Sequence, residues 1–467
     1  MMLRVIAPIF ILLIATMQAA GALSSPTQNL AQAIRYRTIS AQDTAKIDYS
    51  QFEQFNAFLH KTYPRVFSQL QVEQINQHSL LLRWPGSSSD TEKLPVLFAA
   101  HMDVVPIEPG TEGDWTHPPF DGVVADGNIY GRGTLDDKVG VIGLLEAAEQ
   151  LLAEGFVPER TLVFAFGHDE EIGGLEGAAA IARRLRELNL YFEWMVDEGG
   201  LILSDNPLVE DKPVAMINVA EKTYFTLTLV ATGDGGHSST PPQVSTIGRL
   251  SAALARIEQN PFPSKLVGPV KAMLEALGPH AGQPTKFVFS QLWLTGGIVE
   301  YQMSRDRLTN AYVRTTTALT MFNAGVKENV VPQRAEAKVN FRLLPGDTPD
   351  YVVETITGIV DDENIEISFD AWSAAAPVAD YSGSGYAVIK GAVEAIYPDV
   401  VVVPSLLSGA TDTRHYIDLV DNIYRFHGMI LATTQAKGVH GTDEYIGVES
   451  FEASVKVAKQ MIQLGAK

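Results

Sequence analysis

Three short apolar runs, each followed by histidine or acidic residues, constrain the fold of this 467-residue chain most strongly. The runs lie at 95–100 (PVLFAA), 161–166 (TLVFAF) and 192–196 (FEWMV). Helical patterns separate them at 139–154 and 176–188. Continuous apolar runs of this length are typical of strands buried on both faces. Their alternation with helices predicts a mainly parallel sheet with helices on both faces.

The pattern changes near residue 218. Tyr224–Ala231 (YFTLTLVA) alternates apolar and polar residues, as expected for a half-exposed antiparallel strand. The following segments complete a β-α-β-β-α-β order: a helix at 246–257, strands at 313–322 and 335–343, a helix at 349–360, and a strand at 365–370. Parallel-sheet character then resumes with a helix at 384–396, a strand at 400–404 and a closing helix at 449–463.

These patterns predict one α/β domain split by an inserted α+β domain. The expected parts are 23–217 and 376–467 for the α/β domain and 218–375 for the insertion. Within the insertion, a Pro-rich stretch at 259–300 carries apolar residues that would suit a bound acyl chain or, equally well, buried packing.

Residues 1–22 have the order of a secretory signal peptide. Arg4 precedes an apolar run at 5–16, and small residues follow, with cleavage expected near Ala20 or Ala22. The alternative is an uncleaved anchor helix, because about 20 apolar residues can span a bilayer. Both interpretations predict export to the periplasm or the exterior.

Charge and cysteine content exclude several classes of protein. Lys and Arg total 35 and Asp and Glu total 55, giving a net charge of −20. This sign argues against binding to nucleic-acid phosphates or to an anionic membrane surface. The chain has no cysteine, which excludes disulfides, thiol catalysis, iron–sulfur clusters and cysteine-bound zinc. Any metal must therefore be held by His, Asp and Glu.

Such residues follow the predicted strands at the points where the strands end. They are His101 and Asp103, then Asp136 and Asp137 after Gly131-Arg132-Gly133, then Glu170 and Glu171, and Asp197 and Glu198. His440 lies in a loop near the C-terminus, within Gly438-Val439-His440-Gly441. The carboxyl ends of parallel strands meet at one sheet edge, where sites form. Clustered carboxylates repel one another unless a cation neutralises them. Histidine with carboxylate suits zinc in a hydrolytic site.

The surrounding motifs resemble a known family. They are H-M-D at 101–103, G-R-G-T-L-D-D-K at 131–138, D-E-E-I-G-G at 169–174, D-E-G-G at 197–200, G-G-H-S-S at 235–239, N-V-V-P at 329–332, F-R-L-L-P-G at 341–346, S-G-A-T-D-T-R-H at 408–415 and V-H-G at 439–441. In this order they resemble the di-zinc metallopeptidase family of carboxypeptidase S, aminoacylase, glutamate carboxypeptidase and succinyl-diaminopimelate desuccinylase. R-T-T-T-A-L-T at 314–320 and I-Y-R-F at 423–426 look closest to the branch of carboxypeptidase S and secreted N-acyl-amino-acid hydrolases.

The resemblance implies a zinc-peptidase catalytic domain with an inserted lid and dimerisation domain, and a role for each residue. His101 and Asp197 would hold one Zn²⁺, Glu171 and His440 the other, and Asp136 would bridge them; Co²⁺ or Mn²⁺ are alternative metals. Asp103 would orient the His101 ring, and Glu170 would be the general base. Asp137 and Glu198 stand next to proposed ligands, so they are the alternatives if the register is shifted by one residue.

The resemblance also implies a substrate pocket. His237 would stabilise the oxyanion, often from the partner subunit of a homodimer, with Asn329 and Arg342 completing the pocket and binding a substrate carboxylate. Gly409 would offer backbone contacts, and Arg414 would add positive charge.

The expected activity is metal-dependent hydrolysis of an amide bond in a substrate with a free carboxylate. Two versions remain open: a carboxypeptidase or dipeptidase, and an N-acyl-amino-acid hydrolase that could also run in reverse. A non-catalytic binding protein on the same fold is the remote alternative, although the motifs supply all five ligands and Glu170.

Overall fold

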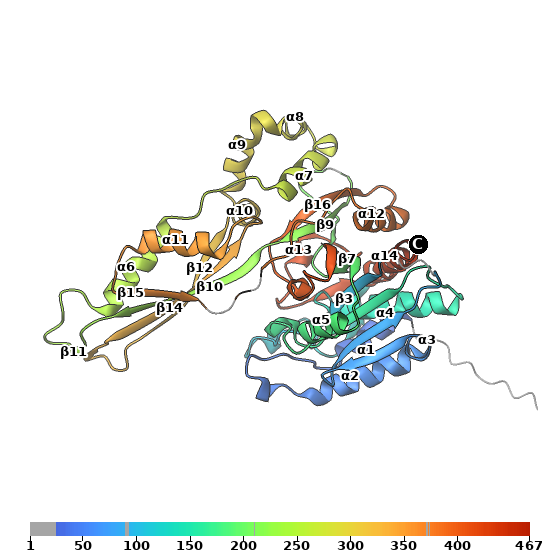
Figure 1. The fold of residues 1–467 in the computed structure, drawn as a ribbon, viewed down its shortest axis with the longest axis horizontal. Helices are drawn as coiled ribbons and strands as arrows, with labels where there is room; N and C mark the ends of the chain where they lie inside the picture. Colours follow the sequence, from blue (N-terminus) through green and yellow to red (C-terminus); the bar gives the residue numbers. More distant parts are fainter. Residues whose placement is uncertain (1–24, 89–92, 210, 370–371, 373) are drawn as a thin grey trace, which may run out of the picture.

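A computed structural model describes residues 25–88, 93–209, 211–369, 372 and 374–467. The predicted signal peptide at 1–22 lies outside the described residues. Within these ranges, no helix combines the length and the apolar character needed to cross a membrane. Figure 1 shows a larger body built on one sheet and an elongated arm that projects from it.

The larger body contains a ten-stranded sheet, counted over the described residues. The strands in order are β1 (Gln71–Ile75), β2 (Ser79–Trp84), β6 (Leu162–Gly167), β3 (Val96–His101), β7 (Phe192–Asp197), β17 (Val420–Arg425), β9 (Val214–Glu221), β8 (Ile202–Leu203) and β18 (Ile430–Leu431), with β16 (Val401–Leu407) also beside β9. The central strands β6, β3, β7 and β17 are parallel. The prediction of a mainly parallel sheet is therefore confirmed, and these four strands end at one edge.

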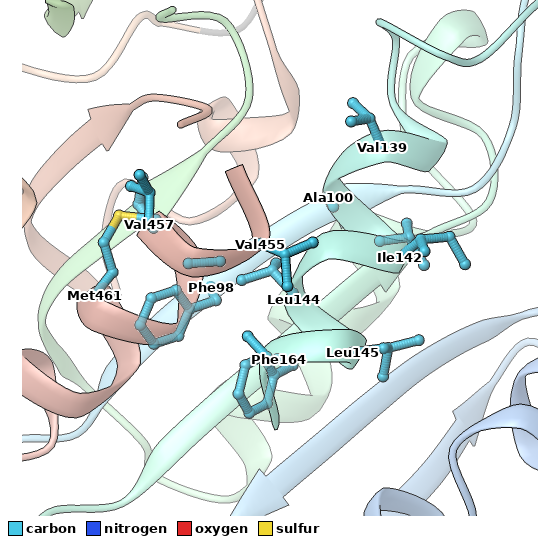
Figure 2. Close-up of a cluster of buried hydrophobic side chains, with 14 of the residues drawn as sticks. Phe98, Ala100, Val139, Ile142, Leu144, Leu145, Phe164, Val455, Val457 and Met461 are labelled. Carbon is cyan, nitrogen blue, oxygen red and sulfur yellow. The ribbon is translucent and has the colours of Figure 1, made fainter. Parts of the chain in front are cut away.

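Alternate residues of the central strands pack on opposite faces of the sheet. On β3, Phe98 belongs to the core on one face and Leu97 to the core on the other. The first core lies beneath α4 (Lys138–Ala153) and α14 (Val448–Gly465), and Figure 2 shows Phe98 and Phe164 near Leu144 of α4. The helices α1 (Pro26–Ile34), α2 (Tyr49–Thr62), α3 (Pro64–Gln69) and α12 (Ser384–Ile396) extend this layer. The opposite face is covered by α5 (Ala178–Glu187).

The arm consists of an antiparallel four-stranded sheet and two helices. The sheet order is β12 (Thr316–Ala324), β14 (Arg334–Leu343), β10 (Thr223–Thr232) and β15 (Ile365–Phe369). The helices α6 (Thr246–Gln259) and α11 (Pro349–Val360) bury the apolar residues of alternating positions on β10 and β14. This order confirms the predicted β-α-β-β-α-β arrangement. A small ribbon of β11 (Gly236–His237) and β13 (Val330–Val331) lies at the end of the arm remote from the large sheet (Figure 1).

Between α6 and β12 the chain forms four helices that the sequence patterns did not predict. They are α7 (Gly268–Leu277), α8 (Thr285–Ser290), α9 (Leu292–Met303) and α10 (Arg307–Val313). Apolar residues of α7 pack with Val401 and Val403 of β16. Phe262, Leu274 and Phe289 are buried, so packing accounts for these apolar residues of the 259–300 stretch.

Two predicted boundaries differ from the structure. The strand predicted at 313–322 begins at Thr316, because the Asp306 carboxylate caps α10 through the Leu308 and Thr309 N–H groups and this helix continues to Val313. The large sheet also continues beyond residue 217, since β9 pairs with β16 as far as Glu221.

The remaining elements are short. They are β4 (Val123–Ala125), β5 (Asn128–Tyr130), β19 (Tyr445–Gly447), α13 (Thr433–Ala436) and the 3₁₀ turns η1 (Thr44–Lys46), η2 (Glu112–Asp114), η3 (Glu170–Ile172), η4 (Gly278–His280) and η5 (Asp412–His415). The strands β4 and β5 form a hairpin that turns at Asp126 and Gly127, both at positive φ.

Candidate active site

The parallel order of β6, β3 and β7 brings three predicted segments to one edge of the sheet. His101 is the last residue of β3 and pairs with Gly167, the last residue of β6. The turn η3, which carries Glu170, follows β6 directly, and Asp197 ends β7. The site therefore lies where parallel strands of an α/β sheet place ligand-binding loops.

Asp136 lies between the two predicted ligand histidines. Its Oδ1 is 2.8 Å from His101 Nε2, and its Oδ2 is 3.0 Å from His440 Nε2. One carboxylate thus faces both rings, each through a separate oxygen. A carboxylate placed in this way can bridge two cations.

Glu171 completes the His440 side of the cluster. Its Oε2 is 3.3 Å from His440 Nε2. Its Oε1 is buried and has no hydrogen-bond partner. Ligand atoms of His101, Asp136 and Glu171 lie within 4.8 Å of one another.

On the His101 side, the structure brings in Glu198, the neighbour of the predicted ligand Asp197. Glu198 Oε1 is 3.6 Å from His101 Nε2, and ligand atoms of His101, Glu170 and Glu198 lie within 4.8 Å of one another. Asp197, the last residue of β7, is buried; its Oδ1 accepts from the Glu198 N–H at 2.9 Å, and its Oδ2 has no hydrogen-bond partner. Neither of the two clusters of candidate ligand atoms found among the described residues includes Asp197.

Asp103 contacts two parts of the cluster, the His101 ring and the main chain of η3. Its Oδ1 is 3.3 Å from His101 Nδ1, so the carboxylate faces the ring nitrogen opposite the one that contacts Asp136. The same carboxylate accepts the N–H groups of Glu170 and Glu171, each at 3.1 Å. Asp103 therefore fixes the His101 ring and the η3 turn together, as a supporting residue of a metal site does.

Glu170 sits beside the cluster in an environment that favours its protonated form. Burial raises the pKa of Glu170 well above its usual value, and the nearby charge of Asp412 adds to the increase. Burial and the charge of Asp136 likewise raise the pKa of Glu198. A carboxyl group with a raised pKa can accept and return a proton near neutral pH.

The electrostatics and donor set of the cluster fit a divalent cation. Asp136 and Glu171 raise the pKa of His440 to about 10, so this environment strongly favours positive charge. Although burial opposes it, contacts with His101 and His440 lower the pKa of Asp136. Glu171 Oε1, which has no hydrogen-bond partner, is a further oxygen that can bind a metal ion. Oxygen and imidazole ligands without sulfur suit zinc and related divalent metals.

Two predicted substrate residues, His237 and Asn329, lie together at the remote end of the arm. His237 is in β11. Asn329 precedes β13, and its main-chain carbonyl accepts the Ser238 N–H at 3.2 Å. The Ser239 N–H donates to His237 Nδ1 at 3.1 Å, which leaves Nε2 as the protonated nitrogen of a neutral ring. In Figure 1, β11 is far from β3 and β7, so the structure does not bring His237 to the cluster of its own chain.

Three further predicted substrate residues lie near the junction of the arm with the large sheet: Arg342, Gly409 and Arg414. Arg342, on β14, stacks over Tyr224 with its guanidinium 4.7 Å from the ring centre. Burial and the charge of Arg414 lower the pKa of Arg342. Gly409 lies in the loop between β16 and η5, next to Ala410.

A cavity of about 390 Å³ occupies this junction. Arg414, Tyr224 and Ala410 contribute to its lining, and so do Gly173 and Leu175 beyond η3. It therefore begins directly beside the turn that carries Glu170 and Glu171.

His427 is a site residue that the sequence motifs did not assign. Its Nε2 lies 2.6 Å from Asp137 Oδ1, and the Asp137 carboxylate also caps α4 through the Gly140 N–H. Asp137 Oδ2 also accepts the His101 N–H at 3.3 Å, so this carboxylate supports the cluster, whereas Asp136 is the one that faces both histidine rings. The signal for His427 is its place directly after the I-Y-R-F motif, at the end of β17 beside β7.

Comparisons with known proteins agree with the sequence motifs. Residues 97–464 match the peptidase family M20/M25/M40. The chain is 37% identical over 442 residues to probable carboxypeptidase S-like 2 of Dictyostelium discoideum, covering 93% of this chain and 84% of that protein. It is 38% identical over 441 residues to N-fatty-acyl-amino acid synthase/hydrolase PM20D1 of Bos taurus, covering 93% and 86%. Carboxypeptidase S of Saccharomyces cerevisiae is 30% identical, covering 89% and 78%.

Solved structures share the fold. The metallo-carboxypeptidase Sso-CP2 of Sulfolobus solfataricus superimposes with a TM-score of 0.68 at 16% identity, covering 95% of this chain and 99% of that one. Human carnosine dipeptidase 1 gives a TM-score of 0.65 at 17% identity, covering 94% and 96%. With the family match over most of the chain, the protein belongs to peptidase family M20/M25/M40 and is a metal-dependent hydrolase of amide bonds.

Proposed function

We propose that the cluster at the sheet edge holds two zinc ions that share Asp136. The main support for this proposal is the position of Asp136, whose two oxygens lie 2.8 Å from His101 Nε2 and 3.0 Å from His440 Nε2. His101 and Glu198 would complete one position. Glu171 and His440 would complete the other. Glu198 is proposed here because its carboxylate faces His101 Nε2, and the predicted Asp197, whose Oδ2 has no hydrogen-bond partner, is the alternative ligand at this position.

When bound, two such ions would lower the pKa of a water molecule and polarise the scissile carbonyl. Glu170 would take the proton of the attacking water and deliver it to the leaving nitrogen. The raised pKa of Glu170 supports this role, since it makes the carboxylate a stronger base toward the proton of the water. Asp103 would hold Glu170 in place through the backbone N–H of that residue.

His237 would act on the substrate of a second copy of the chain. His237 is exposed, and its Nε2–H can donate to the oxyanion that forms on the carbonyl oxygen. A symmetric dimer through the arm would bring His237 and Asn329 of each copy to the cluster of the other. The edge strand β12, with Met321 and Phe322 exposed, offers a surface for this contact.

The substrate would be an amide with a free carboxylate, bound by the Arg342 guanidinium. Both a peptide and an N-acyl amino acid have this group. The junction cavity favours the N-acyl amino acid as a second candidate, because its lining includes Leu175, Tyr224, Phe225 and Trp372. These apolar side chains suit an acyl chain, and the charged residues of the same lining, Glu221, Lys222, Lys338 and Arg414, leave room for a polar end of the substrate.

A substrate panel tests this proposal. Purified protein would be given N-acyl amino acids of increasing chain length and dipeptides with the same C-terminal residue, and amino-acid release would be measured. We expect release that a chelator abolishes. Release from dipeptides alone would assign peptidase activity, and no release from either series would contradict the proposed function.

We also propose that the chain is exported through its N-terminal 22 residues. N-terminal sequencing of the mature protein would test this. A first residue near position 21 or 23 is expected, and an intact Met1 would contradict cleavage.

A further inference from the structure

A buried carboxylate, Glu444, lies between the loops that carry Asp136 and His440. Its side chain is 0% exposed. Glu444 Oε1 accepts the N–H groups of Gly133 at 3.0 Å and Leu135 at 2.7 Å. These N–H groups belong to the main chain immediately before Asp136. Glu444 thus holds the segment that positions the shared ligand.

Arg132 connects the same carboxylate to the His440 loop. One terminal nitrogen of its guanidinium donates to Glu444 Oε2, and the other donates to the Gly441 carbonyl at 3.1 Å. Gly441 directly follows His440. Since a guanidinium is planar, its two nitrogens hold these two acceptors at a fixed separation. Arg132 is itself only 3% exposed, so solvent does not compete for these contacts.

His440 has few other constraints on its position. Its side chain is 51% exposed, and the ring contacts Asp136 and Glu171, both of which are predicted ligands. A second link joins the loop to Thr116, whose hydroxyl donates to Asp443 at 2.9 Å. That link does not reach the Asp136 segment.

We propose that Arg132 and Glu444 are positioning residues that fix the separation of Asp136 and His440. They would thereby set the affinity of the metal position that these two share with Glu171. The inference rests on the two-metal centre proposed above. Residues that support metal ligands typically change metal affinity by about 10–100-fold when they are replaced. The His101 position shares Asp136 with this one, but its other ligands lie at the ends of β3 and β7 and have no contact with Arg132 or Glu444.

Glu444→Gln separates the two functions of the carboxylate. A glutamine oxygen at the place of Oε1 still accepts both backbone N–H groups, whereas its amide nitrogen faces the donor of Arg132. The variant therefore removes the link to Arg132 and keeps the contacts to Gly133 and Leu135.

Glu149→Gln is a matched control. Glu149, on α4, is also a buried carboxylate that accepts two backbone N–H groups and one arginine: Arg65 N at 3.2 Å, Val66 N at 2.9 Å and Arg65 at 3.1 Å. Its side chain is 7% exposed, and its contacts lie on α3, away from the cluster. It reports what loss of such a carboxylate does to stability alone.

The test is titration of zinc into the full-length metal-free chain. Wild type should show two binding steps; Glu444→Gln should weaken one of them about 10–100-fold, and Glu149→Gln neither. Unchanged affinities in folded Glu444→Gln would overturn the positioning role. If that variant does not fold, Arg132→Lys serves instead, because one ammonium replaces the fork, and the same outcomes apply. A wild-type chain that binds no zinc would overturn the two-metal centre itself.

Discussion

The large sheet and the arm both contribute predicted site residues, but only the sheet assembles its share within one chain. His101, Asp136, Glu171 and His440 meet because the loops that carry them converge on one edge of the sheet. His237 lies at the remote end of the arm, beside Asn329 (Figure 1). Strand order in a parallel sheet determines which loop residues meet. The place of an arm tip depends on another body, which the fold of one chain does not determine.

The largest expected effect is on the sheet side. Glu170→Gln should reduce kcat about 10²–10⁴-fold, because the amide cannot accept the proton of the attacking water. Metal content should be unchanged, since Glu170 is not assigned as a ligand. Rate measurements with metal analysis check this. Glu176→Gln, an exposed acid farther along the same loop, is the control. Full activity in Glu170→Gln would exclude Glu170 as the base.

The next largest effect is expected for His237, at the end of the arm. His237→Ala should reduce kcat about 10²–10³-fold through loss of one oxyanion donor, with metal binding intact. A change in metal affinity instead would place His237 in the metal centre.

Mixing Glu170→Gln with His237→Ala tests whether His237 acts in the site of the partner subunit. If His237 acts on the partner's cluster, a heterodimer of Glu170→Gln and His237→Ala contains one complete site. Subunit exchange at equal concentrations should then restore about a quarter of the wild-type activity. No recovery after verified exchange would show that each chain uses its own His237.

A smaller effect is expected at the junction. Arg342→Ala should raise KM for a substrate with a free carboxylate about 10–100-fold, because a charge-assisted hydrogen bond is lost. Arg342→Lys should retain part of the affinity, since an ammonium keeps the charge but not the fork. Steady-state kinetics on an acid substrate and its amide separate the cases. An equal loss for both substrates would contradict carboxylate binding by Arg342.

The smallest expected effect concerns Lys222, at the connection between the large sheet and the arm. Lys222 lies between β9 and β10, and its Nζ donates to the carbonyls of Ala311 at 3.0 Å and Arg314 at 2.8 Å. Burial, together with the charge of Arg342, lowers the pKa of Lys222 to about 7. Between that value and the ordinary value of 10.5, the unfolded chain binds more protons than the folded one. Stability should therefore rise with pH across this window, by at most about 1.4 kcal/mol per unit.

Lys222→Met should remove this contribution. Urea unfolding from pH 7 to pH 9 would compare the slopes of stability against pH for the two proteins. Equal slopes would show that Lys222 keeps its proton in the folded state.

The fold class and most of the sheet-edge residues could be predicted from the sequence because the motifs follow recognisable strands. The side-chain positions of Asp197 and Glu198 could not, since they depend on where β7 ends: the last strand residue is buried and the next one faces His101. The helix α9 could not be predicted because apolar residues occur all around it: Trp293 and Leu294 are exposed and Leu292 is buried. Glu444 and His427 act through contacts with distant segments, which local patterns do not reveal.

The most direct test of the two-metal centre is the recovery of activity as zinc is returned to the metal-free protein. Amino-acid release should rise with added zinc and level off at two equivalents per chain, because Asp136 lies between two ligand sets. A plateau at one equivalent, or activity that does not depend on added metal, would contradict the account.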